Sequence, residues 1–224
     1  MISRSLALIL LNFTSVYAQE DPAAVPLGFI RVVDAINKGT GPLRVSLDGE
    51  DIRPKGYQLG DATGGIGLKL GSQRLKFVRE GIVEGATTVI LKKDRTVTLI
   101  PFARLIPASD QKPSSFEVKV LHLEQKSVET GRTVTFVSVS ASPEVKAELM
   151  AEDGTWRSAF VKHLKTAEIP MKSSQAFVSV KLDGLLTTPI PVGGDGNYVV
   201  VIYDDADMKL QSVYFRDFKY LSAD

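Results

Sequence analysis

Apolar and polar residues alternate with a period of two along most of the chain. In the segment 43–47, three apolar side chains project to one side, and Arg44 and Ser46 project to the other. Similar short runs, bounded by Gly, Pro, Asp or Ser, recur to the C-terminus. This period predicts half-buried β-strands, because an amphipathic helix has apolar residues three and four apart. The predicted strands cover residues 28–35, 43–47, 66–70, 74–79, 87–91, 96–100, 116–123, 134–139, 145–150, 176–182, 198–203 and 210–215.

One segment, 143–153, fits a helix as well as a strand. Val145 and Leu149 are four residues apart, as they would be on one face of a helix. However, the apolar residues also alternate with polar neighbours from 145 to 150, and an Asp-Gly turn follows at 153–154. These two features favour a strand.

The segment 106–115 divides the chain nearly in half. Its sequence, Ile-Pro-Ala-Ser-Asp-Gln-Lys-Pro-Ser-Ser, has the composition of a linker. The predicted fold is therefore all-β, with two tandem antiparallel β-sandwich domains of immunoglobulin-like or jelly-roll-like type. The first domain is predicted at 28–105, after a polar leader at 19–27, and the second at 116–221.

Short matches between the two halves suggest an internal duplication. Four segments of the first half resemble segments that lie 100 to 105 residues later. Two sandwiches with the same strand order would produce such matches, and so would strand composition alone. The pairs are Leu47-Asp48-Gly49 with Glu152-Asp153-Gly154, Gly71-Ser72-Gln73 with Ser173-Ser174-Gln175, Thr87-Thr88 with Thr187-Thr188, and 96–100 with 198–202.

The first 18 residues have the pattern of a secretory signal peptide. Arg4 supplies a short positive region, 6–11 is an apolar core, and Val16 and Ala18 suit the −3 and −1 positions of a cleavage site. The apolar run is too short for a membrane-spanning helix, which needs about 20 apolar residues. We therefore expect a periplasmic or secreted protein that is not inserted in a membrane after removal of the signal.

Composition excludes several classes of protein. The 224 residues contain no Cys, which excludes disulfides, thiolate nucleophiles and cysteine metal sites. With 27 basic and 26 acidic residues, the chain lacks the positive charge of a dedicated nucleic-acid binder. Residues 27–107 carry 13 basic and 8 acidic side chains, whereas 108–224 carry 13 and 16. This asymmetry could steer a partner or help the domains to dock, although such a surface is usually just solvated.

The residues with catalytic potential do not form a recognisable motif. His122 and His163 lie 41 residues apart in strand-like patterns, and no Gly-x-Ser-x-Gly sequence supplies a nucleophile. We interpret both as sheet-surface histidines. The glycine-rich segment 60–67 lacks the Lys-Ser/Thr of a phosphate loop and is interpreted as a bend between strands. We predict no catalytic residue and no cofactor.

Two further features are weak candidates for binding. Asp204, Asp205 and Asp207 have a spacing that resembles hard-cation ligands, but the Gly and distal Glu of a calcium loop are missing, so a hairpin turn is favoured. Trp156, the single Trp of the chain, follows Gly154 and is a candidate for surface contact with a ligand or partner.

The first half resembles the DUF4397 type of secreted bacterial β-sandwich modules. The resemblance rests on Gly28-Phe-Ile-Arg-Val-Val-Asp-Ala35, on Leu43-Arg-Val-Ser-Leu-Asp-Gly49, and on strands at 66–78 and 87–100. Asp34 stands where that family has Asn or His. The two-domain layout is similar to that of the AlgF family of periplasmic alginate O-acetylation proteins. The resemblance implies a non-enzymatic accessory module that assists modification or export of a surface polysaccharide.

We therefore expect a protein that acts by binding an envelope protein or polysaccharide rather than by catalysis. Three functions stay open: an envelope adaptor for polysaccharide O-acetylation or export, a carbohydrate-binding or adhesion module, and a hydrolase with carboxylates distant in sequence. An adaptor predicts protein contacts, a lectin predicts an exposed aromatic or acidic groove, and a hydrolase predicts two facing carboxylates in a cleft. The oligomeric state is not indicated.

Overall fold

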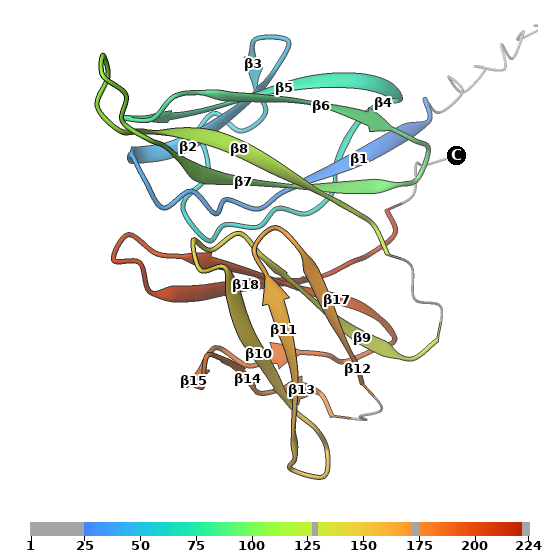
Figure 1. The fold of residues 1–224 in the computed structure, drawn as a ribbon. Helices are drawn as coiled ribbons and strands as arrows, with labels where there is room; N and C mark the ends of the chain where they lie inside the picture. The colour runs from blue at the N-terminus through green and yellow to red at the C-terminus, as the bar shows by residue number, and fades with distance from the viewer. Residues whose placement is uncertain (1–24, 127–129, 172–174, 221–224) are drawn as a thin grey trace, which may run out of the picture.

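The regular structure consists of β-strands. The computed structural model describes residues 25–126, 130–171 and 175–220 (Figure 1). The all-β prediction is confirmed, and the ambiguous segment at 143–153 contains strand β10 (Glu144–Met150). Within the described ranges, no helix has the length and apolar character needed to cross a membrane. The predicted signal peptide lies outside these ranges, as does most of the polar leader.

The first sandwich consists of two four-stranded sheets. Its core is formed by side chains that alternate inward from both sheets, among them Val45, Phe77 and Leu99. One sheet has the order β4 (Ile66–Lys69), β1 (Leu27–Val32), β7 (Thr96–Ile106), β8 (Ser115–Glu124), and the other has β3 (Glu50–Asp51), β2 (Thr40–Leu47), β5 (Gly71–Glu80), β6 (Gly85–Leu91).

The second sandwich repeats this arrangement. Its core includes Phe136, Leu149 and Val200. One sheet has the order β12 (Thr166–Met171), β9 (Arg132–Ser138), β17 (Gly196–Asp204), β18 (Leu210–Arg216), the other has β11 (Trp156–Lys162), β10, β14 (Val180–Leu182), β15 (Leu185–Leu186), and a short pair joins β13 (Phe177–Val178) to β16 (Ile190–Pro191).

The two sandwiches share one topology. Every strand from β1 to β8 has a counterpart, and β1 runs parallel to β7 as β9 does to β17. The Asp-Gly turn at 48–49 joins β2 to β3, and the turn at 153–154 joins their counterparts, β10 and β11. The sequence match of 96–100 with 198–202 is one residue out of register with the structure. Val97 faces the core of the first sandwich, whereas Val199, its partner in the sequence match, faces away from the core of the second. The match at 173–174 lies outside the described residues.

The predicted linker at 106–115 is wrong. This segment is the loop of a long hairpin, in which β7 and β8 pair from Val97 with Glu124 to Ile106 with Ser115. Backbone hydrogen bonds between Ser109 and Lys112, of 2.9 and 3.1 Å, close its tip. A hairpin tip needs the same Pro, Ser and Asp residues as a linker, so composition does not separate the two. The first domain therefore extends to the end of β8, and the chain crosses to the second domain after it.

Strands β11 and β12 were not predicted. Both lie at sheet edges, with one hydrogen-bonded neighbour each. Half of the β11 side chains project outward, and inward-facing Arg157 interrupts its apolar alternation. Edge strands commonly carry such charged residues, which weaken the alternation on which a prediction depends.

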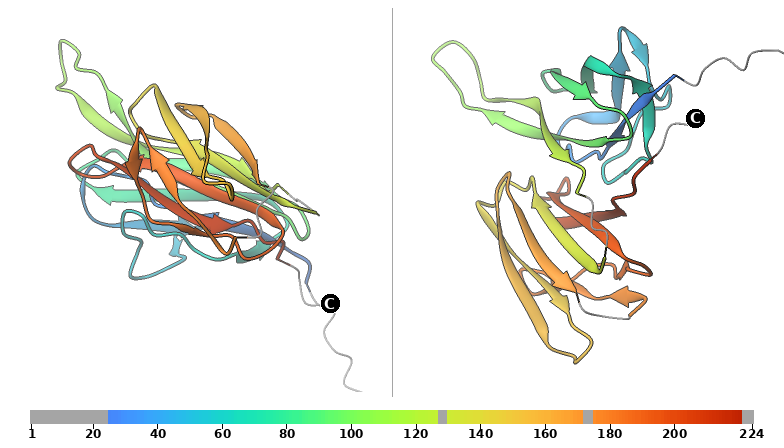
Figure 2. Two further views of the ribbon diagram at one scale, coloured as in Figure 1. Left: turned by 90° about the horizontal axis from the view of Figure 1, so that it is seen from below. Right: turned by 90° about the vertical axis from the view of Figure 1, so that its right-hand side faces the viewer.

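A third apolar core joins the two domains. The outer side of sheet β4-β1-β7-β8 packs on the outer side of sheet β12-β9-β17-β18, so the molecule is a stack of four sheets (Figure 2). The central strands of the two middle sheets, β1, β7, β9 and β17, are buried on both sides over most of their length, which explains continuous apolar runs such as 198–203. This core includes Val33, Ile100, Phe102, Val137, Val199, Val201 and Tyr203.

A buried arginine fastens one end of this interface. Arg31, on β1, is 1% exposed and forms an ion pair with Asp217 at 3.4 Å. Its guanidinium lies 4.0 Å from the centre of the Phe215 ring and donates a 3.3 Å hydrogen bond to the hydroxyl of Tyr220. Tyr220 also packs on Phe29, so the segment after β18 returns to the first domain (Figure 1). The domains are held mainly by apolar packing, with this charged cluster at its edge.

Candidate functional site

The sheet β11-β10-β14-β15 presents one side away from both the second core and the first domain. Alternation along β11 places Ala159 and Val161 inward, so Trp156 and Phe160 project outward. Cross-strand pairing brings Glu148, Lys181 and Leu186 into one row on the same side. We define the outer β10 face as Lys146, Glu148, Trp156, Phe160, Lys181 and Leu186.

This face combines large apolar side chains with paired charges. Phe160 is 61% exposed and Leu186 is 68% exposed. The Lys181 ammonium lies 3.9 Å from the centre of the Trp156 ring, and Lys146 forms a 2.7 Å ion pair with Glu148. Trp156, the predicted contact residue, is therefore half-buried beneath a lysine, whereas Phe160 is the more accessible ring. The sequence carries no clear signal for the orientation of Phe160, because Arg157 interrupts the apolar alternation of β11 and only pairing with β10 shows which row of side chains faces the core.

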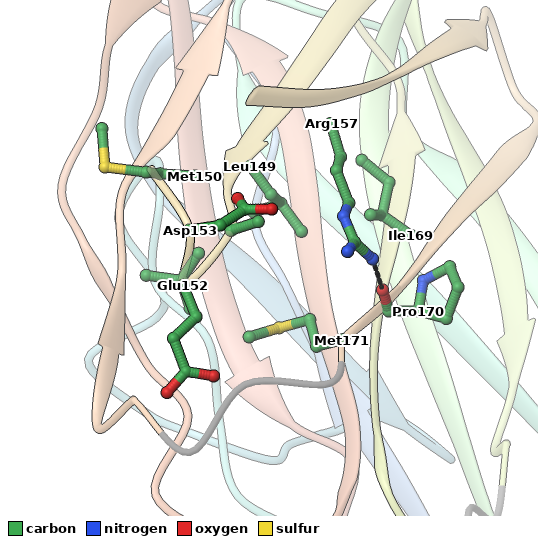
Figure 3. Close-up of a pocket in the computed structure, with 10 residues that line it drawn as sticks. Leu149, Met150, Glu152, Asp153, Arg157, Ile169, Pro170 and Met171 are labelled. Carbon is green, nitrogen blue, oxygen red and sulfur yellow. Dashed lines mark hydrogen bonds between the residues drawn. The ribbon is translucent and has the colours of Figure 1, made fainter. Parts of the chain in front are cut away.

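A crevice of about 340 Å³ opens at one end of the second sandwich (Figure 3). It lies between the turn after β10 and the end of β12, where the two sheets separate. Its floor is apolar and consists of Leu149, Ile169, Met171 and Val178. Three of these side chains also belong to the second core, so the crevice reaches the interior of the domain.

Charged groups line the rim of this crevice. Arg157 pairs with Leu149 across β10 and β11, so its side chain projects inward, and its Nη1 donates a 3.4 Å hydrogen bond to the carbonyl of Pro170 on the opposite sheet (Figure 3). Asp153 accepts hydrogen bonds from the Thr155 amide at 2.9 Å and hydroxyl at 2.6 Å, which lower the pKa of its carboxyl. Glu152 points away from Arg157. The two acids do not form a facing pair of the kind a hydrolase needs.

The two histidines lie in different domains and connect elements. His122 Nε2 is 2.7 Å from Thr87 Oγ1 on the facing sheet, and desolvation lowers the pKa of its ring. His163 Nδ1 is 2.7 Å from the Ser140 carbonyl, and its ring meets the edge of Phe102 from the first domain. Both histidines therefore lie at packing interfaces. His122 lies between the two sheets of the first domain, and His163 lies between the two domains.

The three aspartates of the metal candidate do not converge. Asp204 is buried and accepts 2.7 Å hydrogen bonds from the Ser140 hydroxyl and the Ala141 amide. Asp205 accepts hydrogen bonds from the amides of Asp207 and Lys209, and these bonds lower the pKa of its carboxyl. Among the described residues, no group of three or more His, Cys, Asp or Glu side chains is arranged to hold a metal ion. The segment forms the β17–β18 turn.

The glycine-rich segment 60–67 allows close approach between domains. Gly60 has φ +86°, and a Cβ there would lie 2.5 Å from the hydroxyl oxygen of Tyr203 in the second domain. A Cβ on Gly65 would lie within 3 Å of the Tyr220 ring. The segment connects β3 to β4, as a bend, and its glycines make room for two tyrosines of the second domain.

A buried ion pair, which the sequence patterns did not indicate, lies in the first domain. Arg79 Nη2 is 2.6 Å from Asp34 Oδ2, and both side chains are buried. Burial raises the pKa of Asp34 to about 6, because desolvation outweighs the attraction of Arg79. Arg79 also donates to the carbonyls of Ile36 and Tyr57. The pair connects the segment just after β1 to β5, so its role is to hold the fold of the first domain together.

Comparison with known proteins does not assign a family. No family model matches the chain, and no curated protein matches it. Among solved structures, it is similar to the Bacillus anthracis TIE protein, with 11% identity and a TM-score of 0.23 over 88% of this chain and 49% of that chain. The chain therefore spans about half the length of that structure. At this level of similarity, we draw no conclusion about fold or function.

Proposed function

We propose that this protein is an exported, non-enzymatic adaptor of the cell envelope, which binds a partner protein through the outer β10 face. The observation that carries the proposal is the exposure of Phe160 and Leu186 on a sheet whose other side packs in the second core. Phe160 and Leu186 lie on the two edge strands of this sheet, with Lys146, Glu148 and Lys181 between them. Exposed large apolar side chains among polar ones are a feature of protein interaction sites. The proposed role in polysaccharide O-acetylation or export is the setting in which such an adaptor would act.

The chemistry of the face favours a protein partner. Aromatic side chains are enriched at the centres of protein interfaces, and a leucine contributes apolar area but no flat ring for a sugar. Lys146 and Glu148 lie on β10, between the strands that carry Phe160 and Leu186, and their charges are already paired with each other, so a partner covering the face would not have to neutralise either charge. The third core supports this role, since it fixes the second domain on the first and leaves the outer β10 face free.

A carbohydrate ligand is the second candidate. Trp156 and Phe160 lie on the same side of β11, four residues apart, which corresponds to about 13 Å along a strand. Two rings at this separation could stack on different sugar units of one chain. Lys181, which covers the Trp156 ring, would have to move for the first ring to stack.

Site-specific photocrosslinking tests the adaptor function. A benzophenone amino acid is placed at position 160 in the full chain and expressed in its own host. The matched control is position 90, because Ile90 is 68% exposed on an outer sheet of the first domain. We expect a discrete crosslinked protein from position 160 only, and we expect Leu186→Ser to reduce it.

The alternatives give different results. Equal crosslinking from both positions, or none from position 160, would contradict the adaptor proposal. Binding on a glycan array that is lost in Trp156→Ala and Phe160→Ala variants would favour the carbohydrate ligand. Cell fractionation with an intact N-terminus tests export, and recovery in the cytoplasm at full length would contradict that part of the proposal.

A further inference from the structure

The crevice at the end of the second sandwich has the form of a small-ligand site. Its volume of about 340 Å³ falls within the ~300–1,000 Å³ range of small-molecule pockets. Its floor is lined by the buried core side chains Leu149 and Ile169 and by partly exposed Met171. A ligand with an apolar body would replace water on this floor and so bind favourably.

The charge at the mouth limits what this ligand can be. Arg157 spans the opening from β11 toward β12, and within the described residues its guanidinium makes one hydrogen bond, a long one to the Pro170 carbonyl (Figure 3). A guanidinium has five N–H donors, so it retains the capacity to bind a carboxylate through two parallel bonds. A cation beside an apolar floor therefore complements an anionic group on an apolar ligand.

The rim acids do not cancel this preference. Both Thr155 hydrogen bonds fall on one oxygen of the Asp153 carboxylate, Oδ1. Besides these bonds, the charge of Arg157 contributes to the lowered pKa of Asp153, but within the described residues no hydrogen bond or ion pair joins the two side chains. The Glu152 carboxylate points away from Arg157 (Figure 3). The charges of the two acids would weaken binding of an anion, since they lie on the same rim, but they do not occupy the guanidinium. The site is thus suited to a single negative charge held directly by Arg157 rather than to a polyanion.

We propose that this crevice binds an amphipathic carboxylate: an apolar chain or ring that packs on Leu149, Ile169 and Met171 and carries one carboxylate that pairs with Arg157. The site is separate from the outer β10 face, because Arg157 and Trp156 project to opposite sides of β11. Its ligand and the proposed protein partner could therefore bind independently.

Titration with octanoate tests the proposal. Binding to the full chain is followed by calorimetry and by fluorescence of Trp156, which is the single Trp of the chain and adjoins Arg157 in sequence. We expect saturable binding of octanoate at one site. We expect 1-octanol, which has the same chain without the charge, to bind at least tenfold more weakly, because a hydrogen bond to a charged group contributes to affinity.

Three variants separate the roles of charge and floor. Arg157→Gln is expected to weaken octanoate binding at least tenfold and to leave 1-octanol unchanged. Met171→Trp, which fills the crevice, is expected to abolish binding of both, with folding checked by thermal unfolding. Arg74→Gln, which alters an exposed arginine on β5 of the first domain, serves as the matched control and is expected to leave both affinities unchanged.

The outcomes decide the proposal. It is overturned if octanoate shows no saturable binding to the folded wild-type chain, or if Arg157→Gln leaves the octanoate affinity unchanged. It is also overturned if Arg74→Gln weakens binding as much as Arg157→Gln, since that result would indicate nonspecific charge attraction. A Met171→Trp variant that folds and still binds octanoate would contradict the assignment to this crevice.

Discussion

Replacing Arg31 with methionine tests how the two domains are held together. The change removes the guanidinium but keeps an apolar side chain of similar length on Phe215. It leaves the Asp217 carboxylate, which is 4% exposed, without its ion-pair partner. Asp217 would retain the 2.9 Å hydrogen bond from the Lys126 amide. Breaking a buried pair by removal of one partner costs about 3–5 kcal/mol, because the other charge stays buried and uncompensated.

The geometry places the expected loss near the lower end of this range. The Arg31–Asp217 distance of 3.4 Å is long for a charge-assisted hydrogen bond, and a single nitrogen–oxygen contact is formed. We therefore expect the Arg31→Met variant to lose about 3 kcal/mol of unfolding free energy. In the double variant Arg31→Met with Asp217→Asn, no charge is left buried, so the loss should fall to about 1 kcal/mol.

Urea unfolding at pH 7 measures both values. Fluorescence of Trp156 reports on the second domain and far-ultraviolet circular dichroism reports on both, so agreement between the two probes shows whether the domains unfold together. A loss below about 1 kcal/mol for Arg31→Met would refute the role of a buried, uncompensated charge. A double variant that loses at least as much unfolding free energy as Arg31→Met would refute the coupling between Arg31 and Asp217.

Further predictions concern burial, backbone conformation and pH. Phe136→Ala should cost about 3–5 kcal/mol in urea unfolding, because Phe136 is fully buried in the second core, whereas Ile90→Ala on the surface should change stability by less than about 0.5 kcal/mol. Gly60→Ala should destabilise more than Gly49→Ala: both glycines have positive φ, but only a Cβ at position 60 meets a neighbour, the Tyr203 hydroxyl, and equal losses would contradict the role of this contact. The raised pKa of Asp34, about 6 against an ordinary 3.8, means that this carboxyl contributes stability below pH 4 that is lost as the pH rises through 6. From pH 4 to 7, wild type should therefore lose about 2 kcal/mol relative to Asp34→Asn, and parallel pH profiles of the unfolding free energy would contradict this.

The amino-acid sequence by itself determined the local elements. Alternation identified β10 as a strand despite the helical spacing of Val145 and Leu149, because period two persists across the whole segment and side chains on a strand alternate between two faces. The Asp-Gly turns at 48–49 and 153–154 marked equivalent corners of two sandwiches with one topology. Trp156 could be proposed as a surface residue from its position after a turn, and it lies on the outer β10 face.

Only the tertiary structure decided which elements belong together. The segment 106–115 has the composition of a linker, yet pairing along the length of β7 and β8 makes it a hairpin tip, since strand pairing depends on register rather than on loop composition. Arg31 and Asp217 are 186 residues apart, and the crevice combines Leu149, Arg157 and Ile169 from three strands. A pattern along the chain reports which side of a strand is apolar. It does not report what that side packs against, so the third core and both candidate sites follow from the way the four sheets are stacked.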